Sequence, residues 1–334
     1  MPERIAVVGA GSWGTALADL LARKEYDVVL WSYEPDVADA IGARHENPKY
    51  LQGVRLADSL QATSSLADAL RGAGVVVSVS PAQHVRAIMA DAAQHLRDDA
   101  LIVSASKGIE QDRLCTMAQV LAQVLPRGTA TAYLSGPSFA LEVAQQMPTA
   151  VTIASHDEDV ALRAQDLFQT PYFRPYTSQD VVGVELGGAL KNVVAVASGM
   201  VTGLGFGHNT TAALITRGLA EITRLAIELG ANPHTLSGLA GMGDLILTCT
   251  GGLSRNRHVG MEIGKGRTLD EVLSEMTMVA EGVATTRATH ALAQRTRVEM
   301  PIASAVYQVL FENRPPADAV ETLMLRDPKP ELWR

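Results

Sequence analysis

The glycine-rich segment Gly9-Ala-Gly11-Ser-Trp-Gly14 limits the possible folds of this 334-residue chain more than any other feature. It follows the apolar run at residues 5–8 directly and opens a stretch at residues 13–24 with helical periodicity. In such a strand–turn–helix, the first glycine permits a tight turn, the second lets the backbone approach a pyrophosphate, and the third lets the helix pack on the strand. The free N–H groups of the helix start attract the phosphates. The pattern predicts a dinucleotide-binding unit at the N-terminus.

Short apolar runs and helical stretches alternate through the first half of the chain. Most of the runs are rich in β-branched residues, as expected for strands that are buried on both faces. Repeated βα units with right-handed crossovers predict a doubly wound parallel sheet, the Rossmann arrangement. The predicted strands are residues 5–8, 27–31, 74–80, 101–106, 131–135 and 150–155, with helices at 13–24, 83–96 and 114–125 among the connections.

Strand-like runs disappear after about Thr177, and the second half has helical patterns alone. Gly230 follows one predicted helix, and Pro233, Pro301 and Pro315 begin new segments. The predicted helices are residues 181–200, 211–229, 268–276, 284–294, 302–312 and 317–325. We therefore expect a dinucleotide-binding domain at residues 1–180, followed by an all-helical substrate and catalytic domain at residues 181–334.

Charge and composition exclude several classes of protein. The net charge of −8 disfavours binding to nucleic acid or to an anionic membrane. The longest weakly polar run, residues 193–207, is too short to span a bilayer. The two cysteines, Cys115 and Cys249, are not part of a Cys/His cluster, so neither a disulfide framework nor a metal site is expected. The sequence predicts a soluble, cytoplasmic protein.

The choice between NAD and NADP depends on the residues after the second predicted strand. An acid about 20 residues past the glycine turn binds the ribose hydroxyl of NAD, whereas an arginine nearby accommodates the 2′-phosphate of NADP. Here the chain reads Ser32-Tyr33-Glu34, with Glu34 beyond the predicted strand end and with no basic residue in the segment. This favours NAD and leaves NADP open.

Lys191 is the most informative residue of the second half. It lies in a predicted helix that is apolar nearly all round, and no other charge flanks it. Burial disfavours a charged lysine and lowers its pKa toward a value useful for proton transfer. Gly187 and Gly188 allow another backbone to approach closely. The alternative is a lysine whose ammonium group reaches the surface.

Two segments follow predicted strands at their carboxyl ends, where open α/β sheets bind ligands. Lys107 comes after the strand at 101–106, and Gly136-Pro137-Ser138 after the strand at 131–135. The alternative for Lys107 is an ordinary exposed loop lysine. The alternative for Ser138 is that it only caps the following helix.

Two further segments lie in predicted glycine-rich connections of the helical half. Ser254-Arg255-Asn256, at an apparent helix start, combines a hydroxyl, a guanidinium, an amide and backbone donors, all of which suit a phosphate. A solvated loop with a helix cap is the alternative. Asp244, among glycines, is predicted either to cap a helix or to position a lysine.

The motifs together resemble the NAD(P)-dependent glycerol-3-phosphate dehydrogenase family of the bacterial type, nearly end to end. They are GAGSWGTALA, SASKGIE, SGPSFALE, GVELGGALKNVVAVASGM, AALITRGLAEITRLA, GLAGMGDLILTCTG, LSRNRHVG, VAEGV and MPI. The resemblance implies a Rossmann domain with a helical domain of the 6-phosphogluconate-dehydrogenase-like kind. It also implies NAD or NADP as cofactor, a phosphorylated small-molecule substrate and a homodimer that supplies glycerol phosphate for phospholipid synthesis.

The resemblance also implies roles for individual residues. Lys191 matches the proton acceptor, with Lys107 and Asp244 beside it in the catalytic set. Substrate contacts are implied for Lys107, Gly136, Ser138, Lys191, Asp244, Ser254, Arg255 and Asn256. Cofactor contacts are implied for Gly9, Gly11, Ser12, Trp13, Gly14, Tyr33, Lys107, Ala140, Arg255, Val279 and Glu281. Two departures stand out: Tyr33 replaces an arginine common in the family, and Gln52 replaces the proline usual in the YLPG segment.

Two other functions fit the same architecture. A ketopantoate or 6-phosphogluconate type of reductase would bind a carboxylate, which Ser254-Arg255-Asn256 and the neighbouring GDLILTCT segment disfavour. A non-catalytic dinucleotide sensor would not need Lys191, Lys107 and Asp244 together.

Overall fold

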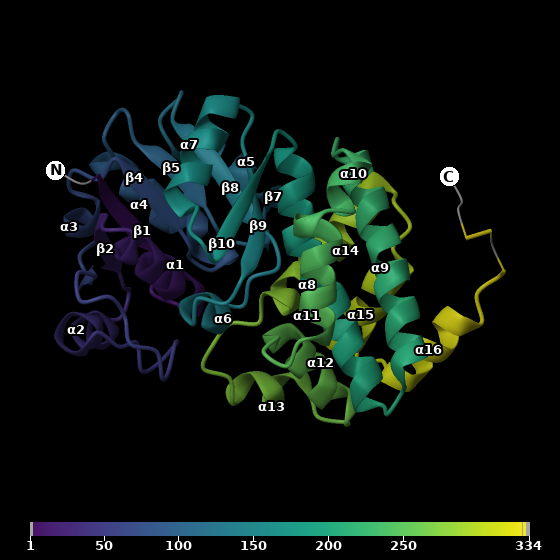
Figure 1. Ribbon diagram of the computed structural model, residues 1–334. Coiled ribbons are helices and arrows are strands. Elements are labelled where there is room, and N and C mark those ends of the chain that lie inside the picture. The colour runs from purple at the N-terminus through teal and green to yellow at the C-terminus, as the bar shows by residue number, and fades with distance from the viewer. Residues whose placement is uncertain (1–2, 329, 332–334) are drawn as a thin grey trace.

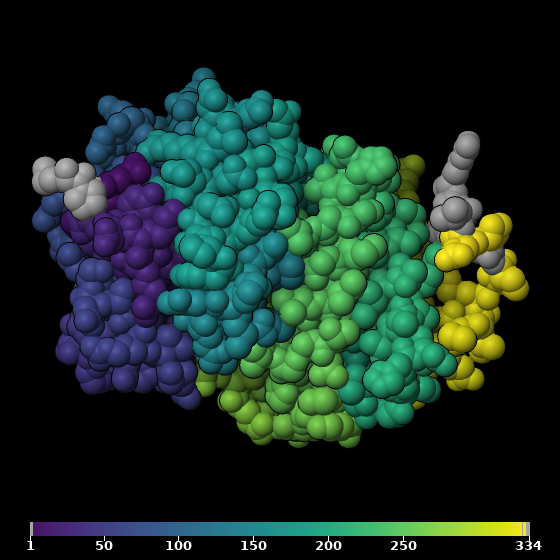
Figure 2. Space-filling model, in the orientation of Figure 1, coloured from purple at the N-terminus to yellow at the C-terminus, as the bar shows by residue number. Residues whose placement is uncertain are grey.

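The computed structural model describes residues 3–328 and 330–331. A sheet with helices on both faces forms the N-terminal part, and a bundle of helices forms the C-terminal part (Figure 1). On the face shown in Figure 2 the two parts meet along a continuous boundary. The helical part begins with α8 at Val181, and we propose the domain boundary between residues 180 and 181.

The strands are β1 Arg4–Val8, β2 Asp27–Trp31, β3 Gln61–Thr63, β4 Val75–Ser78, β5 Leu101–Ser104, β6 Ile109–Glu110, β7 Cys115–Thr116, β8 Ala130–Ser135, β9 Thr149–Ala154 and β10 Phe173–Ser178. The helices of the first part are α1 Ser12–Arg23, α2 Pro35–Arg44, α3 Leu66–Leu70, α4 Val85–Ala92, α5 Met117–Val124, α6 Ala140–Ala144 and α7 Glu158–Phe168. Those of the second part are α8 Val181–Gly203, α9 His208–Glu228, α10 Pro233–Leu236, α11 Asp244–Thr250, α12 Arg255–Gly264, α13 Leu269–Ser274, α14 Glu281–Thr296, α15 Pro301–Phe311 and α16 Pro316–Met324.

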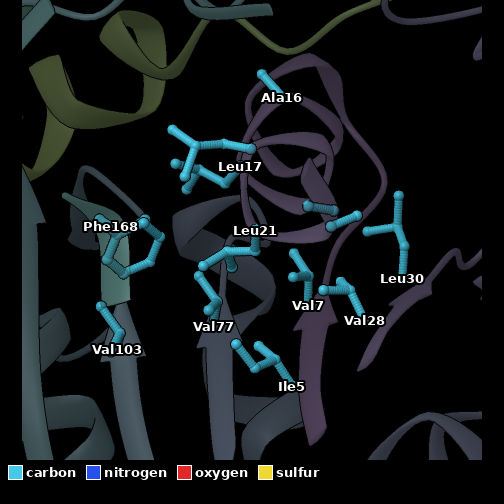
Figure 3. Packing of buried hydrophobic residues seen from close by; sticks show 14 of the residues in the cluster. Ile5, Val7, Ala16, Leu17, Leu21, Val28, Leu30, Val77, Val103 and Phe168 are labelled. Atoms are coloured by element: carbon cyan, nitrogen blue, oxygen red, sulfur yellow. The ribbon is translucent and has the colours of Figure 1, made fainter. Parts of the chain in front are cut away.

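The eight-stranded sheet has the order β10-β9-β8-β5-β4-β1-β2-β3. Its central strands are buried because helices cover both faces, and the core between α1 and the sheet is built from aliphatic side chains. Leu21 of α1 lies next to Val77 of β4, and Leu17 extends from α1 toward the side of Phe168 (Figure 3). This packing holds the start of α1 at the carboxyl ends of β1 and β4.

The sheet differs from the predicted all-parallel arrangement at one edge. Strand β9 pairs antiparallel with β8, and β10 then pairs parallel with β9. The chain between β8 and β9 contains only the five-residue helix α6, about 7.5 Å long at 1.5 Å per residue. Strand β8 has six residues and spans roughly 20 Å. A helix that short does not carry the chain back to the opposite edge of the sheet, so β9 starts beside the end of β8.

The Rossmann-type sheet and the helical second half are both confirmed, whereas several local predictions were wrong. The predicted helix at 83–96 is α-helical only over Val85–Ala92, with a 3₁₀ turn at each end, and the one at 114–125 begins with strand β7. Strands β3, β6, β7 and β10 were not predicted. The glycine-rich "connections" of the second half are a π-helical turn, Leu239–Gly243, followed by helices α11 and α12.

Helix α8 is the centre of the helical part. It packs against α9, α11, α12 and α14, and most of its residues are buried. With 23 residues and a mean hydropathy of 1.4 over its most apolar window, it is long and apolar enough to cross a membrane. However, 89% of that window is buried inside the protein. We therefore interpret α8 as a core helix, since a helix that is hydrophobic all round is expected at the centre of a bundle.

Small residues let α8 and α12 approach at backbone contact distance. A Cβ atom on Gly260 would lie 1.9 Å from the carbonyl oxygen of Val196, and one on Gly199 would lie 2.0 Å from the carbonyl oxygen of Arg257. Any side chain at either position forces the two helices apart. This contact fixes the distance between α8, which carries Lys191, and α12, which carries Arg255.

Replacing Gly260 with alanine should lower the free energy of unfolding by about 1–3 kcal/mol, because overpacking forces backbone shifts. The matched control is Gly42→Ala in α2, where a Cβ atom would meet no other atom within 4 Å. That change should leave stability unchanged or raise it by up to about 1 kcal/mol, the helix-propensity difference. Urea unfolding of both variants measures the effect. Equal midpoints for Gly260→Ala and the unmodified chain would contradict the packing argument.

Candidate functional site

The turn between β1 and α1 has the geometry that a pyrophosphate requires. Gly9 has a φ of +124°, and a Cβ on Gly14 would lie 1.8 Å from the carbonyl oxygen of Gly9, so both positions demand glycine. A Cβ on Gly11 would meet no protein atom within 4 Å, which leaves open space in front of the helix. No side chain caps the start of α1, so its first N–H groups are available to an anion. These residues fit a dinucleotide.

Other predicted cofactor residues surround this turn. Ser12 and Trp13 open α1, and the buried indole N–H of Trp13 has no hydrogen-bond partner among the described residues. Ala140 begins α6, which packs against α1. Tyr33 follows β2 and is 84% exposed.

A carboxylate joins the two predicted lysines across the domain junction. Lys107 follows β5 in the sheet domain, and its ammonium donates to Asp244 Oδ2 at 2.8 Å and to the carbonyl oxygen of Gly136 at 2.9 Å. Lys191 on α8 donates to the other oxygen of the same carboxylate, Oδ1. Asp244 is 1% exposed and is the first residue of α11. Of the two roles predicted for Asp244, the structure shows the one that positions a lysine.

The Nζ atom of Lys191 has three positions that are not bonded to carbon, and hydrogen-bond partners occupy two of them. Besides the bond to Asp244, Nζ donates to Thr248 Oγ1 at 2.8 Å. The hydroxyl of Thr248 uses its own proton on the carbonyl oxygen of Asp244, at 2.6 Å, so it accepts from the lysine. A neutral amine has two N–H bonds and one lone pair, and an ammonium group has a third N–H in place of that lone pair. The third position is therefore the one that can give or take a proton.

Burial lowers the pKa of Lys191 to about 8, because desolvation disfavours its charge. The positive charge of Lys107 lowers it further, whereas Asp244 raises it. The side chain is 9% exposed, so the prediction of a buried lysine is confirmed and the surface alternative was wrong. Its pKa lies in the range useful for general acid and base catalysis near neutral pH.

The glycines next to Lys191 allow the elements of the site to meet. A Cβ on Gly187 would lie 2.5 Å from the carbonyl oxygen of Ala240, and one on Gly188 would lie 2.3 Å from Ser135 Oγ. The first contact brings the π-helical turn before Asp244 against α8, and the second brings the end of β8 against it. The predicted close approach at this glycine pair is confirmed.

Ser138 has a different local role from the predicted cap. Helix α6 begins at Ala140 with Phe139 as its N-cap residue, and no side chain caps it. Ser138 Oγ instead donates to the carbonyl oxygen of Gly136 at 3.0 Å, the same oxygen that accepts from Lys107. The φ of +139° at Gly136 turns the chain there. Ser138 thus lies beside Lys107.

The start of α12 contains the predicted phosphate residues. Ser254 is the N-cap of α12 and accepts from the N–H of Arg257 at 3.2 Å, so its hydroxyl does act as a cap. Asn256 is buried, donates to Asn192 Oδ1 at 2.8 Å, and accepts from the N–H of Gly282 at 2.8 Å. Arg255 is exposed and donates to the carbonyl oxygen of Val279 at 3.0 Å.

Glu281 connects this end of the helical part to the sheet domain. It begins α14, and its Oε1 accepts from the N–H of Ala82, just after β4, at 3.1 Å. Its Oε2 is buried without a partner among the described residues. Arg255, Val279 and Glu281 therefore lie together, as the resemblance implied for residues that share one ligand.

Two residues of this network were not predicted from the sequence. Thr248 lies one helical turn after Asp244 in GDLILTCT, and Asn192 follows Lys191 directly. The i, i+4 spacing of Asp244 and Thr248 was a signal that both face one side of a helix. Its meaning depended on knowing that this segment is helical.

The whole chain is similar to a known protein family. Residues 4–161 match the model of the NAD-dependent glycerol-3-phosphate dehydrogenase N-terminus, and residues 180–321 match that of the C-terminus. A relative from Geobacter sulfurreducens, "Glycerol-3-phosphate dehydrogenase [NAD(P)+]", is 58% identical over 335 residues, covering 100% of both chains.

Solved structures show the same relationship. A crystal structure of glycerol-3-phosphate dehydrogenase from Coxiella burnetii is 39% identical, with a TM-score of 0.94, and the match covers 97% of this chain and 99% of that one. A ketopantoate reductase from Ralstonia eutropha matches at 14% identity with a TM-score of 0.60, covering 95% and 99% of the two chains. The second likeness is one of fold alone.

Proposed function

The chain belongs to the NAD-dependent glycerol-3-phosphate dehydrogenase family, and from that premise we propose how its own residues carry out the reaction. It is an oxidoreductase that transfers hydride between NAD(P) and the pair sn-glycerol 3-phosphate and dihydroxyacetone phosphate. Its role is to supply glycerol 3-phosphate for phospholipid synthesis. The observation that carries the mechanism is the buried carboxylate of Asp244 between Lys191 and Lys107.

Lys191 is the proton carrier. In the oxidation of glycerol 3-phosphate, its neutral amine takes the proton of the secondary hydroxyl at the third position of Nζ. In the reduction, its ammonium form returns that proton to the oxygen of the ketone. Such positioned proton transfer typically contributes about 10²–10⁴ in rate. When bound, NAD(P) supplies the hydride acceptor for the oxidation and the hydride donor for the reduction.

Asp244 and Lys107 position and tune Lys191. Because Asp244 Oδ1 and Thr248 hold two positions of Nζ, the third position has a fixed direction toward the reacting oxygen. Lys107 keeps the carboxylate neutralised and lowers the pKa of Lys191. Lys107, Gly136 and Ser138 also contact substrate at the carboxyl end of the sheet, where a bound alcohol meets both domains.

The dinucleotide is held by the glycine turn and by the residues that surround it. Gly9, Gly11 and Gly14 shape the turn, and Ser12 and Trp13 start the helix that faces the pyrophosphate. Tyr33 lies on the adenosine side. The cofactor contacts on the side of the helical domain are Ala140, Lys107, Val279, Glu281 and Arg255.

The substrate phosphate is held at the start of α12. Arg255 provides a charge, and Ser254 and Asn256 provide polar groups on the same turn. A protein with a net charge of −8 needs a local cationic group to bind a dianion. The phosphate thus serves as a remote handle that positions the reacting carbon. We further propose a soluble, cytoplasmic homodimer.

Lys191→Met should preserve the fold while turnover falls by about 10²-fold or more, since the proton carrier is lost. Steady-state turnover with dihydroxyacetone phosphate and NADH measures the change. Fluorescence titration with NADH provides the control, because cofactor binding should be retained. Turnover above about a tenth of the original rate would exclude Lys191 as the proton carrier.

The pH profile should follow the charges around Lys191. Oxidation needs the neutral amine, so its kcat/KM should rise with pH and level off above about 8, while the reduction should weaken above the same pH. Lys107→Met should move this limb to higher pH, because a positive neighbour is removed. Asp244→Asn should move it to lower pH, because a negative neighbour is removed. If the apparent pKa of the kcat/KM profile moves in the same direction in both variants, the assignment to Lys191 is contradicted.

Arg255→Ala should remove a charge-assisted contact to phosphate of about 1.5–3 kcal/mol. This corresponds to roughly 10- to 150-fold in kcat/KM for dihydroxyacetone phosphate. The loss should largely vanish with unphosphorylated dihydroxyacetone at saturating cofactor. Arg295→Ala, the same change of charge at an exposed position of α14, serves as the control. Equal proportional losses for both substrates would show that Arg255 does not bind the phosphate.

A further inference from the structure

Glu34, just past the end of β2, pairs with a basic residue from another segment, although Ser32-Tyr33-Glu34 itself contains no basic residue. Its carboxylate forms an ion pair with Lys49 and accepts a hydrogen bond from the hydroxyl of Tyr50 at 2.9 Å. Lys49 follows α2, and its side chain is 37% exposed. The hydrogen bond to Glu34 raises the pKa of Lys49 and keeps it charged. A cation therefore does lie at the end of β2.

The fold itself brings this lysine to the glycine turn. Asn47 is fully buried and donates to the carbonyl oxygen of Ala10 at 2.9 Å and to Thr15 Oγ1 at 2.8 Å. The carbonyl oxygen of its side chain accepts from the N–H of Tyr50 at 3.0 Å. Asn47 thus ties the segment that contains Lys49 and Tyr50 to the turn that faces the pyrophosphate.

This position is where a doubly wound sheet binds the adenosine ribose. Strand β2 lies beside β1, with Val8 paired to Trp31, and the N–H of Gly9 donates to the carbonyl oxygen of Trp31. An acid after the second strand binds the ribose 2′-hydroxyl of NAD, and a cation there accepts the 2′-phosphate of NADP. Ser32 is buried, and its hydroxyl accepts from the N–H of Glu34. Of the charged groups on these two segments, Glu34 and Lys49 are the two that pair with each other.

We propose that the Glu34–Lys49 ion pair determines the choice of cofactor. Glu34 accepts a hydrogen bond from the 2′-hydroxyl of NAD. Lys49 can bind the 2′-phosphate of NADP, but its ammonium group is paired with Glu34. The inference rests on the proposed function of the dinucleotide site. Glu34 acts against NADP in two ways: its charge repels a 2′-phosphate, and it engages the cation that such a phosphate needs. Removing the acid therefore ends the repulsion and leaves Lys49 available to a phosphate.

Four variants test this by binding alone, without turnover. The dissociation constants of NADH and NADPH are measured by fluorescence titration for Glu34→Gln, Lys49→Gln, the double variant and Asp58→Asn. Asp58 is the matched control, because it forms an exposed ion pair with Arg55 away from the glycine turn, and its substitution makes the same change of charge. The quantity of interest is the ratio of the NADPH constant to the NADH constant.

The ratio should fall by about tenfold or more in Glu34→Gln, the size of a charge-assisted contact to phosphate. The double variant should keep only the part of that gain that comes from removing the repulsion, because the cation is lost as well, and Asp58→Asn should keep the original ratio. If the unmodified chain binds NADH, an unchanged ratio in Glu34→Gln, or the same gain in the double variant, would overturn the proposal and leave the dinucleotide site in place. Failure of the unmodified chain to bind NADH would overturn the dinucleotide site itself, and the proposal with it.

Discussion

The carboxylate of Asp244 is the group on which the arrangement of this protein depends. It accepts from Lys107 of the sheet domain through one oxygen and from Lys191 of the helical domain through the other. A buried carboxylate without partners is strongly destabilising, as is a buried lysine without partners. The buried carboxylate is therefore tolerated because both lysines contact it, and the carboxylate in turn offsets the burial of each lysine. The same network that joins the domains gives Lys191 a working pKa.

Close helix packing makes this network possible. A carboxylate on α11 reaches a lysine on α8 because Gly187 lets the turn before Asp244 contact α8 at backbone distance. Further along α8, Gly199 allows α12 the same approach, which sets the position of Arg255 relative to Lys191. An apolar helix with small residues at its contacts therefore fulfils two requirements. It buries enough surface to form a core, and it keeps polar groups of different helices within hydrogen-bond distance.

The dinucleotide side follows a different physical principle. The glycine turn works through backbone groups, and its fit depends on positive φ angles and on empty space rather than on side chains. Around it, buried polar side chains such as Asn47 hold the neighbouring segment in place. The turn can therefore be shared by many dehydrogenases, while the side chains on that segment differ from one chain to the next.

The sequence by itself determined the strand–turn–helix at residues 4–23, the helical second half and the burial of Lys191, because these depend on periodicity and composition within one segment. It also determined the family, through motifs that lie within single segments. Only the tertiary structure decided which groups meet. Asp244 lies 53 residues from Lys191 and 137 residues from Lys107, and Lys49 lies 15 residues from Glu34. Local propensity carries no information about such pairs, since they arise from how whole elements dock. The antiparallel β9 has the same origin: its direction was set by a connection too short to cross the sheet.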